Sequence, residues 1–282
     1  MKYLLINKKT HNENYREALL SLEKFLSDGF NEIEVSNDDF NYEEFMKKLE
    51  EKDEVIICGG DGTLNYFINH IDLDNIKNNI YLYPAGTGND FLNDLNKKDT
   101  KEPILINEYL KNLPTVIIND ELKMKFINGV GYGIDGYCCE VADNLRDKIN
   151  KPVNYSSIAI NGLLFHFKKR IANIKIDDNN YQFKNVWLVP TMKGRFYGGG
   201  MMIAPNQDRL KDEDLSVVVY KTKSKLKALM VFPSIFKGEH IKKKKVVKIF
   251  KGKNIEVSFN IPCALQVDGE TILNVKKYKV VL

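Results

Sequence analysis

The sequence predicts an α/β domain with a mostly parallel sheet, followed by a β-sandwich domain. The chain has 282 residues, which is enough for two ordinary domains. Short apolar runs alternate with helical patterns over residues 1–120, as in βαβ units. Short strands separated by turns dominate the remainder and favour a sandwich. The expected domains are therefore 1–122 and 123–282, and the sequence leaves open whether the last strand returns to the first domain.

Each element of the first domain has its own signal. Short apolar runs predict strands, and apolar residues at helical spacing predict the helices between them. Gly29 ends the first helical pattern, and Gly-rich loops follow the last two strands. The expected strands are Lys2–Asn7, Glu32–Val35, Val55–Cys58 and Asn79–Tyr83, and the expected helices are Tyr15–Asp28, Tyr42–Leu49 and Leu64–His70.

The second domain is predicted from short apolar runs that are bounded by turns. Two helical patterns interrupt these runs, Tyr155–Lys169 and Lys225–Phe236, the second despite Pro233. The expected strands are Lys125–Tyr132, Ile171–Ile176, Tyr181–Pro190, Ser216–Tyr220, Val246–Phe250, Asn254–Phe259, Cys263–Val267 and Lys277–Leu282.

Composition excludes several classes of protein. A hydrophobic fraction of 43% argues against wholesale disorder. No apolar run approaches the ~18 residues of a membrane span, and the N-terminal run is too short for a signal peptide. The four cysteines lack C-x-x-C spacing, which favours buried reduced thiols over a zinc site. We therefore expect a cytoplasmic protein.

The net charge of +4 conceals an asymmetry between the two halves. Residues 1–120 carry a net charge of −10, and residues 121–282 carry +14. A basic half is typical of proteins that meet nucleic acid or an anionic membrane. Lysines on ordinary solvated faces are the alternative explanation.

The strongest motif is Gly59-Gly60-Asp61-Gly62-Thr63-Leu64-Asn65, which follows an expected strand and opens an expected helix. Glycines let the backbone approach a ligand, and N–H groups at a helix N-terminus favour phosphate. Asp61 would repel phosphate unless a cation is present, and Mg²⁺ with ATP meets that requirement. Asn65, one helical turn beyond Asp61, can point to the same place. A tight turn without a ligand is the alternative.

A second junction repeats this arrangement at Pro84-Ala85-Gly86-Thr87-Gly88-Asn89-Asp90-Phe91. Neighbouring parallel strands that end in Gly-rich loops form one crevice at their carboxyl ends, where ligands of open α/β sheets bind. Thr87 can donate to phosphate, and Asp90 can hold a cation-bound water or the acceptor hydroxyl. An ordinary loop with Asn89 or Asp90 as helix N-cap is the alternative.

Together these motifs resemble the nucleotide-site signature of the diacylglycerol kinase catalytic-domain family, G-G-D-G-T-x-N followed by P-x-G-T-x-N-D-F. That family includes soluble bacterial lipid kinases and is related to sphingosine and ceramide kinases. The resemblance covers nearly the whole chain. It continues through Asn128–Asp135, Gly194–Met201 with Ala204-Pro205-Asn206, and the motif Asp268-Gly269-Glu270.

The resemblance implies Mg-ATP-dependent phosphorylation of a lipid hydroxyl. Asp61 would organise Mg²⁺, and Asp90 would lie beside the acceptor. Glu270 would be the general base, since an ionised carboxylate can accept a hydroxyl proton. Asp268 would position or ligate metal, although a plain β-turn also explains Asp-Gly. The ATP-binding residues would be Asn7, Gly59, Gly60, Asp61, Gly62, Thr63, Leu64, Asn65, Gly86, Thr87 and Asn89.

The resemblance also implies a structural Mg²⁺ site in the second domain. The matching stretch begins at Asp212, but Glu213 replaces a Gly and Ser216 replaces an Asp. Asp212 and main-chain carbonyls near Arg209 and Asp214 would supply the ligands. An acidic surface turn is the alternative. The first loop also departs from the family pattern, because Asn7 is followed by a lysine where Pro is usual.

These observations define the expected reaction and partners. The reaction most expected is phosphorylation of diacylglycerol to phosphatidic acid at the inner face of the membrane. The basic second domain would bind that surface peripherally, without a transmembrane segment. No readout motif indicates a specific nucleic acid, and a homodimer is left open. Another lipid alcohol or NAD as acceptor, and a non-catalytic lipid- or nucleotide-binding module, stay as alternatives.

Overall fold

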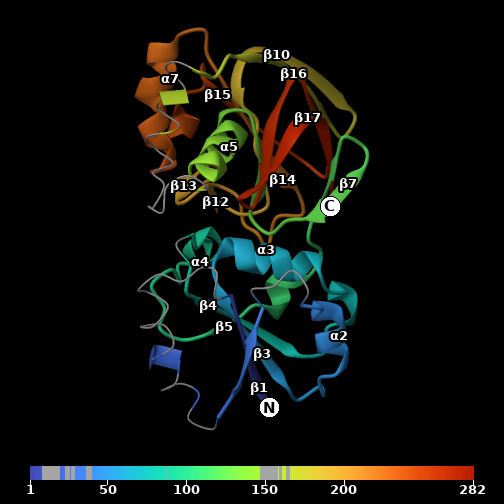
Figure 1. The fold of residues 1–282 in the computed structure, drawn as a ribbon. Helices are drawn as coiled ribbons and strands as arrows, with labels where there is room; N and C mark the ends of the chain where they lie inside the picture. Colours follow the sequence, from blue (N-terminus) through green and yellow to red (C-terminus); the bar gives the residue numbers. More distant parts are fainter. Residues whose placement is uncertain are drawn as a thin grey trace. The chain divides into compact units, whose positions relative to one another are not determined.

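The computed structural model describes residues 1–7, 20–22, 26, 29–35, 40–86, 88–146, 158, 161–162 and 166–282. It comprises two compact units, Met1–Leu113 and Pro114–Leu282, which we describe separately (Figure 1). The expected helices Tyr15–Asp28 and Tyr155–Lys169 lie mostly outside the described residues.

The first unit is built on one five-stranded sheet. Its strands are β1 (Lys2–Ile6), β2 (Asn31–Glu34), β3 (Glu54–Gly59), β4 (Asn79–Pro84) and β5 (Ile104–Leu105). Their order is β2-β1-β3-β4-β5, with β5 antiparallel to β4 and the other pairs parallel. This mostly parallel sheet confirms the predicted α/β class.

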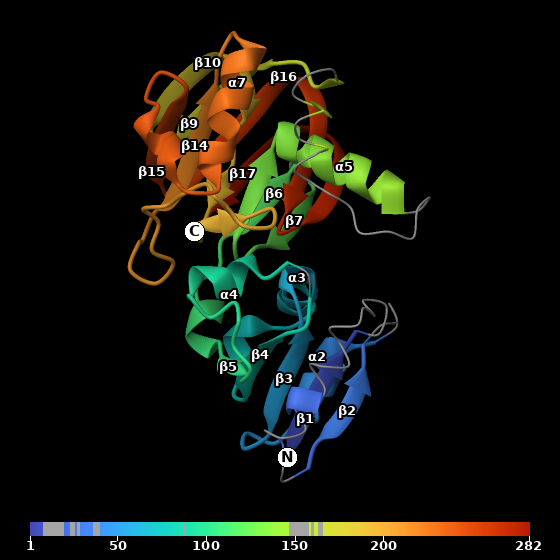
Figure 2. The same ribbon diagram turned by 90° about the vertical axis from the view of Figure 1, so that its left-hand side faces the viewer.

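Short helices connect the strands of the first unit. They are α2 (Tyr42–Lys47), α3 (Asp61–Asn69), η2 (Leu73–Asn75), α4 (Asp90–Asp94) and η3 (Asn107–Leu110). Leu64, Phe67 and Ile68 are buried on α3, which is the i, i+3, i+4 stripe of a helix that packs on a sheet. α3 starts three residues earlier than predicted, because its first turn includes part of the Gly-rich motif. Figure 2 shows α3 and α4 at the same end of strands β3 and β4.

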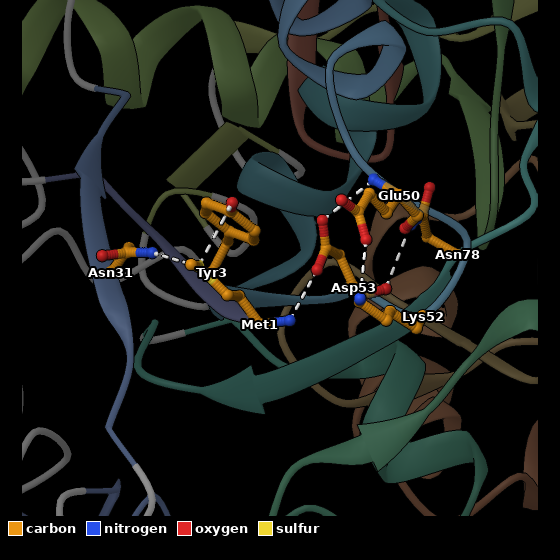
Figure 3. Close-up of polar contacts among 7 residues, drawn as sticks. All are labelled: Met1, Tyr3, Asn31, Glu50, Lys52, Asp53 and Asn78. Atoms are coloured by element: carbon orange, nitrogen blue, oxygen red, sulfur yellow. Dashed lines mark hydrogen bonds and ion pairs between the residues drawn. The ribbon is translucent and has the colours of Figure 1, made fainter.

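The other edge of this sheet, where β1, β3 and β4 begin, is held together around Asp53 (Figure 3). The Asp53 carboxylate accepts from the α-ammonium group of Met1 and, at 2.9 Å, from the Glu50 N–H. The Asn78 side-chain amide donates to the carbonyls of Glu50 at 2.7 Å and Asp53 at 3.0 Å. These contacts lie at the edge opposite to the Gly-rich loops and tie the strand starts together.

The second unit is built mainly from strands. They are β6 (Thr115–Ile118), β7 (Leu122–Lys125), β8 (Gly129–Tyr132), β9 (Arg170–Ile176), β10 (Asn179–Leu188), β11 (Thr191–Met192), β12 (Phe196–Tyr197), β13 (Met201–Met202), β14 (Leu215–Lys221), β15 (Val247–Gly252), β16 (Asn254–Val267) and β17 (Glu270–Val281). β9 pairs with both β10 and β16, so β16, β8, β11, β14, β10 and β9 close into a ring. β17, β6 and β7 continue the sheet from β16, and β15 pairs with β14. The β-rich unit agrees with the predicted sandwich class.

Two apolar clusters stabilise the second unit. One contains side chains from the ring strands, such as Tyr132, Val217 and Val257, each with no exposed surface. The other lies where helices cover the strands and includes Trp187 and Tyr197. These helices are α5 (Ile134–Arg146), α7 (Lys225–Val231), η5 (Phe232–Ile235) and η6 (Glu239–Lys242).

Several elements of the second unit differ from the sequence prediction. α5 was not predicted, and the expected strand Lys125–Tyr132 is divided between β7 and β8. The two strands expected on either side of residues 260–262 are one strand, β16, whose register with β17 shifts between Ser258 and Cys263. β6 pairs with β17, so the second unit already begins at Pro114, and the boundary expected at residue 122 falls within β7. In the part of the chain that the structure describes, no helix is long and apolar enough to cross a membrane.

Candidate functional site

The candidate nucleotide site of the first unit lies where the parallel strands end. Ile6 is in register with Cys58, and Gly59 is in register with Pro84. Asn7, Gly60 and Ala85, the next residues along each strand, therefore follow at the same edge of the sheet. The structure thus brings Asn7 and both Gly-rich loops to one edge, as expected for the carboxyl ends of parallel strands.

The two Gly-rich loops contact each other backbone to backbone. A Cβ atom on Gly60 would lie 2.4 Å from the Gly88 carbonyl oxygen, and one on Gly86 would lie 2.7 Å from the Gly60 Cα. The Asp61 N–H donates to the Gly88 carbonyl at 3.0 Å. These glycines are therefore required by the contact between loops, before any ligand is considered.

Asp61 joins the first loop to the second helix through its carboxylate. Its two oxygens accept from the N–H groups of Asp90 at 2.7 Å and Phe91 at 2.9 Å. Asn89 occupies the N-cap position of α4 but makes no side-chain cap, so Asp61 caps this helix from another element. Asp90 itself is buried with 5% of its surface exposed. The carboxylate expected to organise Mg²⁺ thus also fixes the second loop, and a carboxylate has lone pairs enough to accept a ligand as well.

The first turn of α3 has the properties of an anion site. Gly60 caps this nine-residue helix in an extended conformation and contributes no side-chain hydrogen bond. Among the described residues, a Cβ atom on Gly62 would meet nothing within 4 Å, so none of them covers this turn. Open N–H groups at a helix N-terminus suit phosphate. Thr63 Oγ1 would lie 2.4 Å from a Cβ on Gly59, so the hydroxyl folds back over that glycine.

Leu64 and Asn65 are buried on α3, with exposed fractions of 0% and 2%. The Asn69 side-chain amide donates to the Asn65 carbonyl at 2.9 Å and to Asn65 Oδ1 at 3.3 Å. Leu64 packs in the core, so any contact of this residue with nucleotide is left to its main chain. Asn65 keeps its expected place one turn beyond Asp61, and its role in nucleotide binding stays a prediction.

The hydrogen bonds of the Asn89 side chain show whether the second loop could accommodate a ligand. Its side-chain amide donates to the Gly86 carbonyl at 3.0 Å and closes the loop. Its Oδ1 is buried and has no hydrogen-bond partner among the described residues. A buried acceptor of this kind calls for a donor or a bound ion, so it fits the water shell of a Mg²⁺–nucleotide complex. Thr87, expected to donate to phosphate, lies outside the described residues.

The motif Asp268-Gly269-Glu270 forms the tight turn between β16 and β17. Asp268 and Gly269 have φ values of 47° and 101°, which is the type I′ hairpin pattern. Gly269 N–H also donates to Gln266 Oε1 at 2.8 Å. Glu270 is exposed and is the first residue of β17. The turn that was the alternative explanation is present, and it fixes the start of the strand that carries Glu270.

Asp268 is held by main-chain donors. Its carboxylate accepts from the N–H groups of Ile127 at 2.6 Å, Asn128 at 2.9 Å and Gly129 at 2.9 Å. The Arg209 guanidinium binds the same segment. It donates to the Ile127 carbonyl and to Asn128 Oδ1, each at 3.0 Å. The Asp268 carboxylate therefore ties the turn before β17 to the segment before β8, and its expected role of positioning or ligating metal stays a prediction. The Arg209 contact was not predicted, and the only signal for it in the sequence was an Arg beside the A-P-N segment.

The acidic turn expected to hold structural Mg²⁺ contacts lysines. Asp212 Oδ2 accepts from Lys251 Nζ at 2.7 Å and from the Asp208 N–H at 2.8 Å. Glu213 pairs with Lys253 at 2.9 Å, and this ion pair lowers the pKa of the Glu213 carboxyl. The Asp214 carbonyl accepts from the Gln207 side chain at 2.8 Å. Within the described residues, no three His, Cys, Asp or Glu side chains gather as for a metal ion. The metal site stays a prediction, and Lys251 competes for its central carboxylate.

A buried carboxylate that was not singled out in the sequence lies at the start of α5. Asp135 has 7% of its surface exposed, and its Oδ2 accepts from the Tyr197 hydroxyl at 2.9 Å. Its Oδ1 has no hydrogen-bond partner in the described part of the chain. Burial raises the pKa of Asp135 to about 6. Sequence alone could not find it, because its burial depends on Tyr197, which lies 62 residues away.

Two domain families match this chain. Residues 2–116 match the family described as diacylglycerol kinase catalytic domain. Residues 128–280, more than half of the chain, match the family described as YegS C-terminal NAD kinase beta sandwich-like domain. The two matches agree with the resemblance seen in the motifs.

Curated relatives and solved structures resemble the chain at low identity. A "Diacylglycerol kinase" of Mycobacterium tuberculosis is 27% identical over 196 residues, which cover 67% of this chain but only 62% of that protein. The "Putative lipid kinase YtlR" of Bacillus subtilis is 25% identical over 231 residues, or 77% of this chain and 73% of that protein. The crystal structure of a "putative diacylglycerol kinase" from Bacillus anthracis superposes with a TM-score of 0.69 at 18% identity, covering 99% of this chain and 93% of that one. The last comparison supports the fold.

The order of elements, the paired Gly-rich loops and the matched domains therefore lead to one conclusion: the chain belongs to the diacylglycerol kinase catalytic-domain family, with a YegS-type C-terminal domain.

Proposed function

We propose that this protein is an ATP- and Mg²⁺-dependent lipid kinase that phosphorylates a lipid hydroxyl. The observation that carries the proposal is the Asp61 carboxylate, which binds the N–H groups of Asp90 and Phe91 and so holds both Gly-rich loops at one sheet edge. Two features of the described residues support a phosphate and cation ligand there: none of them covers the helix start at Gly62, and none bonds to the buried Asn89 Oδ1. The family to which the chain belongs supports the same chemistry.

Each of the candidate residues has a separate proposed role in phosphoryl transfer. Asn7, the first turn of α3 and the loop at Gly86–Asn89 would hold the nucleotide, with Asp61 beside its Mg²⁺. When bound, Mg-ATP supplies the phosphoryl group and neutralises the charge that develops on it. The family resemblance supports Asp90 of the first unit as the residue beside the acceptor and Glu270 of the second unit as the proposed proton acceptor. Asp268 keeps the Glu270 turn in place through three main-chain hydrogen bonds.

We propose diacylglycerol as the acceptor and phosphatidic acid as the product. The mycobacterial relative named diacylglycerol kinase supports this choice, as does the basic second half, which suits a substrate in an anionic membrane. Sites on one fold take different substrates, so the assay below compares diacylglycerol with other lipid alcohols.

The test is transfer of labelled γ-phosphate from ATP to lipid alcohols in mixed micelles, with and without Mg²⁺, and with NAD as soluble acceptor. We expect label in diacylglycerol and at least a roughly 100-fold loss in Glu270→Gln, the size of a general-base contribution. Glu213→Gln is the matched control, because Glu213 is also a glutamate of the second unit and its side chain is 84% exposed. Label in NAD alone would overturn the lipid assignment. ATP binding without transfer to any acceptor would favour a non-catalytic module.

A further inference from the structure

The helix α7 and the turn η5 that follows it carry apolar residues on two faces. Ala228, Val231 and Ile235 are buried at the i, i+3 and i+7 positions and face the core. Leu226 and Met230, four residues apart and therefore on one face, are each 66% exposed. A helix at a protein surface normally presents polar residues there, so this outer apolar ridge is unexplained by folding.

The segment that presents this ridge is firmly anchored in the second unit. The Ser224 hydroxyl caps α7 by accepting from the Lys227 N–H at 3.2 Å. The Tyr220 hydroxyl donates to the Ala228 carbonyl at 2.6 Å, and His240 contacts the Ile203 carbonyl at 2.9 Å. Figure 1 shows α7 at the outside of this unit. The ridge is thus a fixed surface feature.

Positive charge surrounds the ridge in the sequence. Residues 221–245 contain nine lysines and one acidic residue, Glu239. Lys223, Lys225 and Lys227 are exposed, and so are all four residues of Lys242–Lys245. A partner that fits this segment must combine negative charge with an apolar interior.

We infer that this α7 surface, made of Leu226, Met230 and the three lysines 223, 225 and 227, docks the protein on an anionic phospholipid bilayer. Lysines are attracted to the headgroups, and exposed apolar side chains enter the boundary with the acyl chains. RNA would use the lysines but would leave Leu226 and Met230 without a role. The inference goes beyond the proposed kinase activity, and it explains how a lipid substrate in a membrane would be reached.

Vesicle sedimentation in the absence of ATP tests this surface independently of catalysis. The full chain should pellet with vesicles of phosphatidylglycerol and phosphatidylcholine and stay in solution with phosphatidylcholine alone. A Lys223→Gln, Lys225→Gln, Lys227→Gln triple variant should bind on the order of 100-fold more weakly, from ~1 kcal/mol for each lysine at the surface. Raising the salt should weaken wild-type binding in the same direction.

A second pair of variants separates the apolar ridge from charge. Leu226→Gln with Met230→Gln keeps every lysine and should still reduce vesicle binding about tenfold or more, since buried apolar area contributes to interfacial binding. Leu122→Gln with Leu210→Gln is the matched control, because these leucines are 45% and 50% exposed elsewhere in the second unit. Far-UV circular dichroism and Trp187 fluorescence verify that each variant is folded.

The outcomes decide the inference. The inference would be overturned if wild type and the ridge variant bound anionic vesicles equally well. It would also be overturned if wild type bound neutral vesicles as well as anionic ones. Binding to a single-stranded RNA with the same lysine dependence, without vesicle binding, would assign the surface to nucleic acid instead. A kinase that is inactive but still binds vesicles through this surface would refute the proposed function and leave the docking surface intact.

Discussion

Replacing Asp135 by asparagine should change how the stability of the second unit depends on pH. The carboxylate is buried beside Tyr197, and burial raises its pKa to about 6 from an ordinary value of 3.8. The folded protein therefore holds this proton over a pH range in which the unfolded chain has released it. Protonation of Asp135 therefore favours the folded state. Its contribution to the free energy of unfolding is fully present below about pH 4 and is lost as the pH rises towards and through 6.

The size of this effect follows from the two pKa values. Integrating the proton linkage between 3.8 and about 6 gives a loss of roughly 2–3 kcal/mol in the free energy of unfolding between about pH 4 and pH 7. An asparagine side chain does not ionise, so Asp135→Asn should lack this loss. Its amide brings two N–H donors where the protonated acid has one O–H, and an unpaired buried donor costs about 1–3 kcal/mol at every pH. The informative quantity is therefore the change with pH in the difference between variant and wild type.

Trp187 makes the measurement specific to the second unit. It is the only tryptophan in the chain, has no exposed surface and belongs to the same apolar cluster as Tyr197. Urea unfolding followed by tryptophan fluorescence, at several pH values from about 4 to 7, gives the free energy of unfolding for both proteins. Asp143→Asn removes one negative charge from the same helix and is the control for net charge. Tyr197→Phe, which removes the donated hydrogen bond, should raise the pKa of Asp135 further and steepen the dependence.

A difference between variant and wild type that stays constant over this pH range would refute this reasoning. It would mean that the folded protein stabilises the Asp135 carboxylate as well as water does. A difference that shifts in the opposite direction as the pH rises would mean that folding lowers the pKa of Asp135. That result would indicate a cation or further hydrogen-bond donors at Oδ1.

Four further substitutions test the contacts that shape the site. Asp268→Asn turns the side-chain NH2 group, which cannot accept a hydrogen bond, towards at least one of three main-chain N–H donors. The free energy of unfolding of the second unit should fall by about 2–4 kcal/mol, as measured by urea titration with Trp187 fluorescence. Gly60→Ala places a Cβ 2.4 Å from the Gly88 carbonyl oxygen, so it should lower the melting temperature and abolish ATP binding. Gly62→Ala is the control. Its Cβ meets no described atom within 4 Å, so the melting temperature should stay unchanged or rise slightly. Lys251→Met should cost no more than about 1 kcal/mol, since the pair with Asp212 is partly exposed, and should make the melting temperature rise with added Mg²⁺. No rise with Mg²⁺ in that variant would rule out a cation site at Asp212.

The positions of the Gly-rich loops could be predicted from the sequence because their signals are local. A buried apolar run followed by glycines specifies β3 and its loop, and the same pattern specifies β4. The mostly parallel sheet follows from alternation of strands and helices. What the sequence could not supply was the partner of each charged side chain. The carboxylate of Asp61 binds main-chain groups 29 and 30 residues away, and that of Asp268 binds a group 140 residues away.

α5 and β16 show where local signals fail. α5 contains Gly136, Tyr137 and two cysteines, which are weak helix formers, and it forms because residues such as Cys138 and Ala142 pack against the sheet. The prediction divided β16 into two strands, Asn254–Phe259 and Cys263–Val267, and the gap between them contains Pro262, which cannot donate to a sheet ladder. The structure accommodates this proline where the register shifts between Ser258 and Cys263, a position in which strands tolerate proline.

The acidic residues of the site differ in what a substitution can reveal. Asp61 and Asp268 hold main-chain N–H groups, so an alanine at either position removes structure together with any chemistry. Loss of activity in Asp61→Ala therefore does not by itself distinguish a kinase from a scaffold, because the second loop loses its cap at the same time. Glu270 is exposed at the start of β17, so Glu270→Gln can remove a proton acceptor with little effect on folding. The comparison of Glu270→Gln with Glu213→Gln consequently separates catalysis from stability most cleanly in this chain.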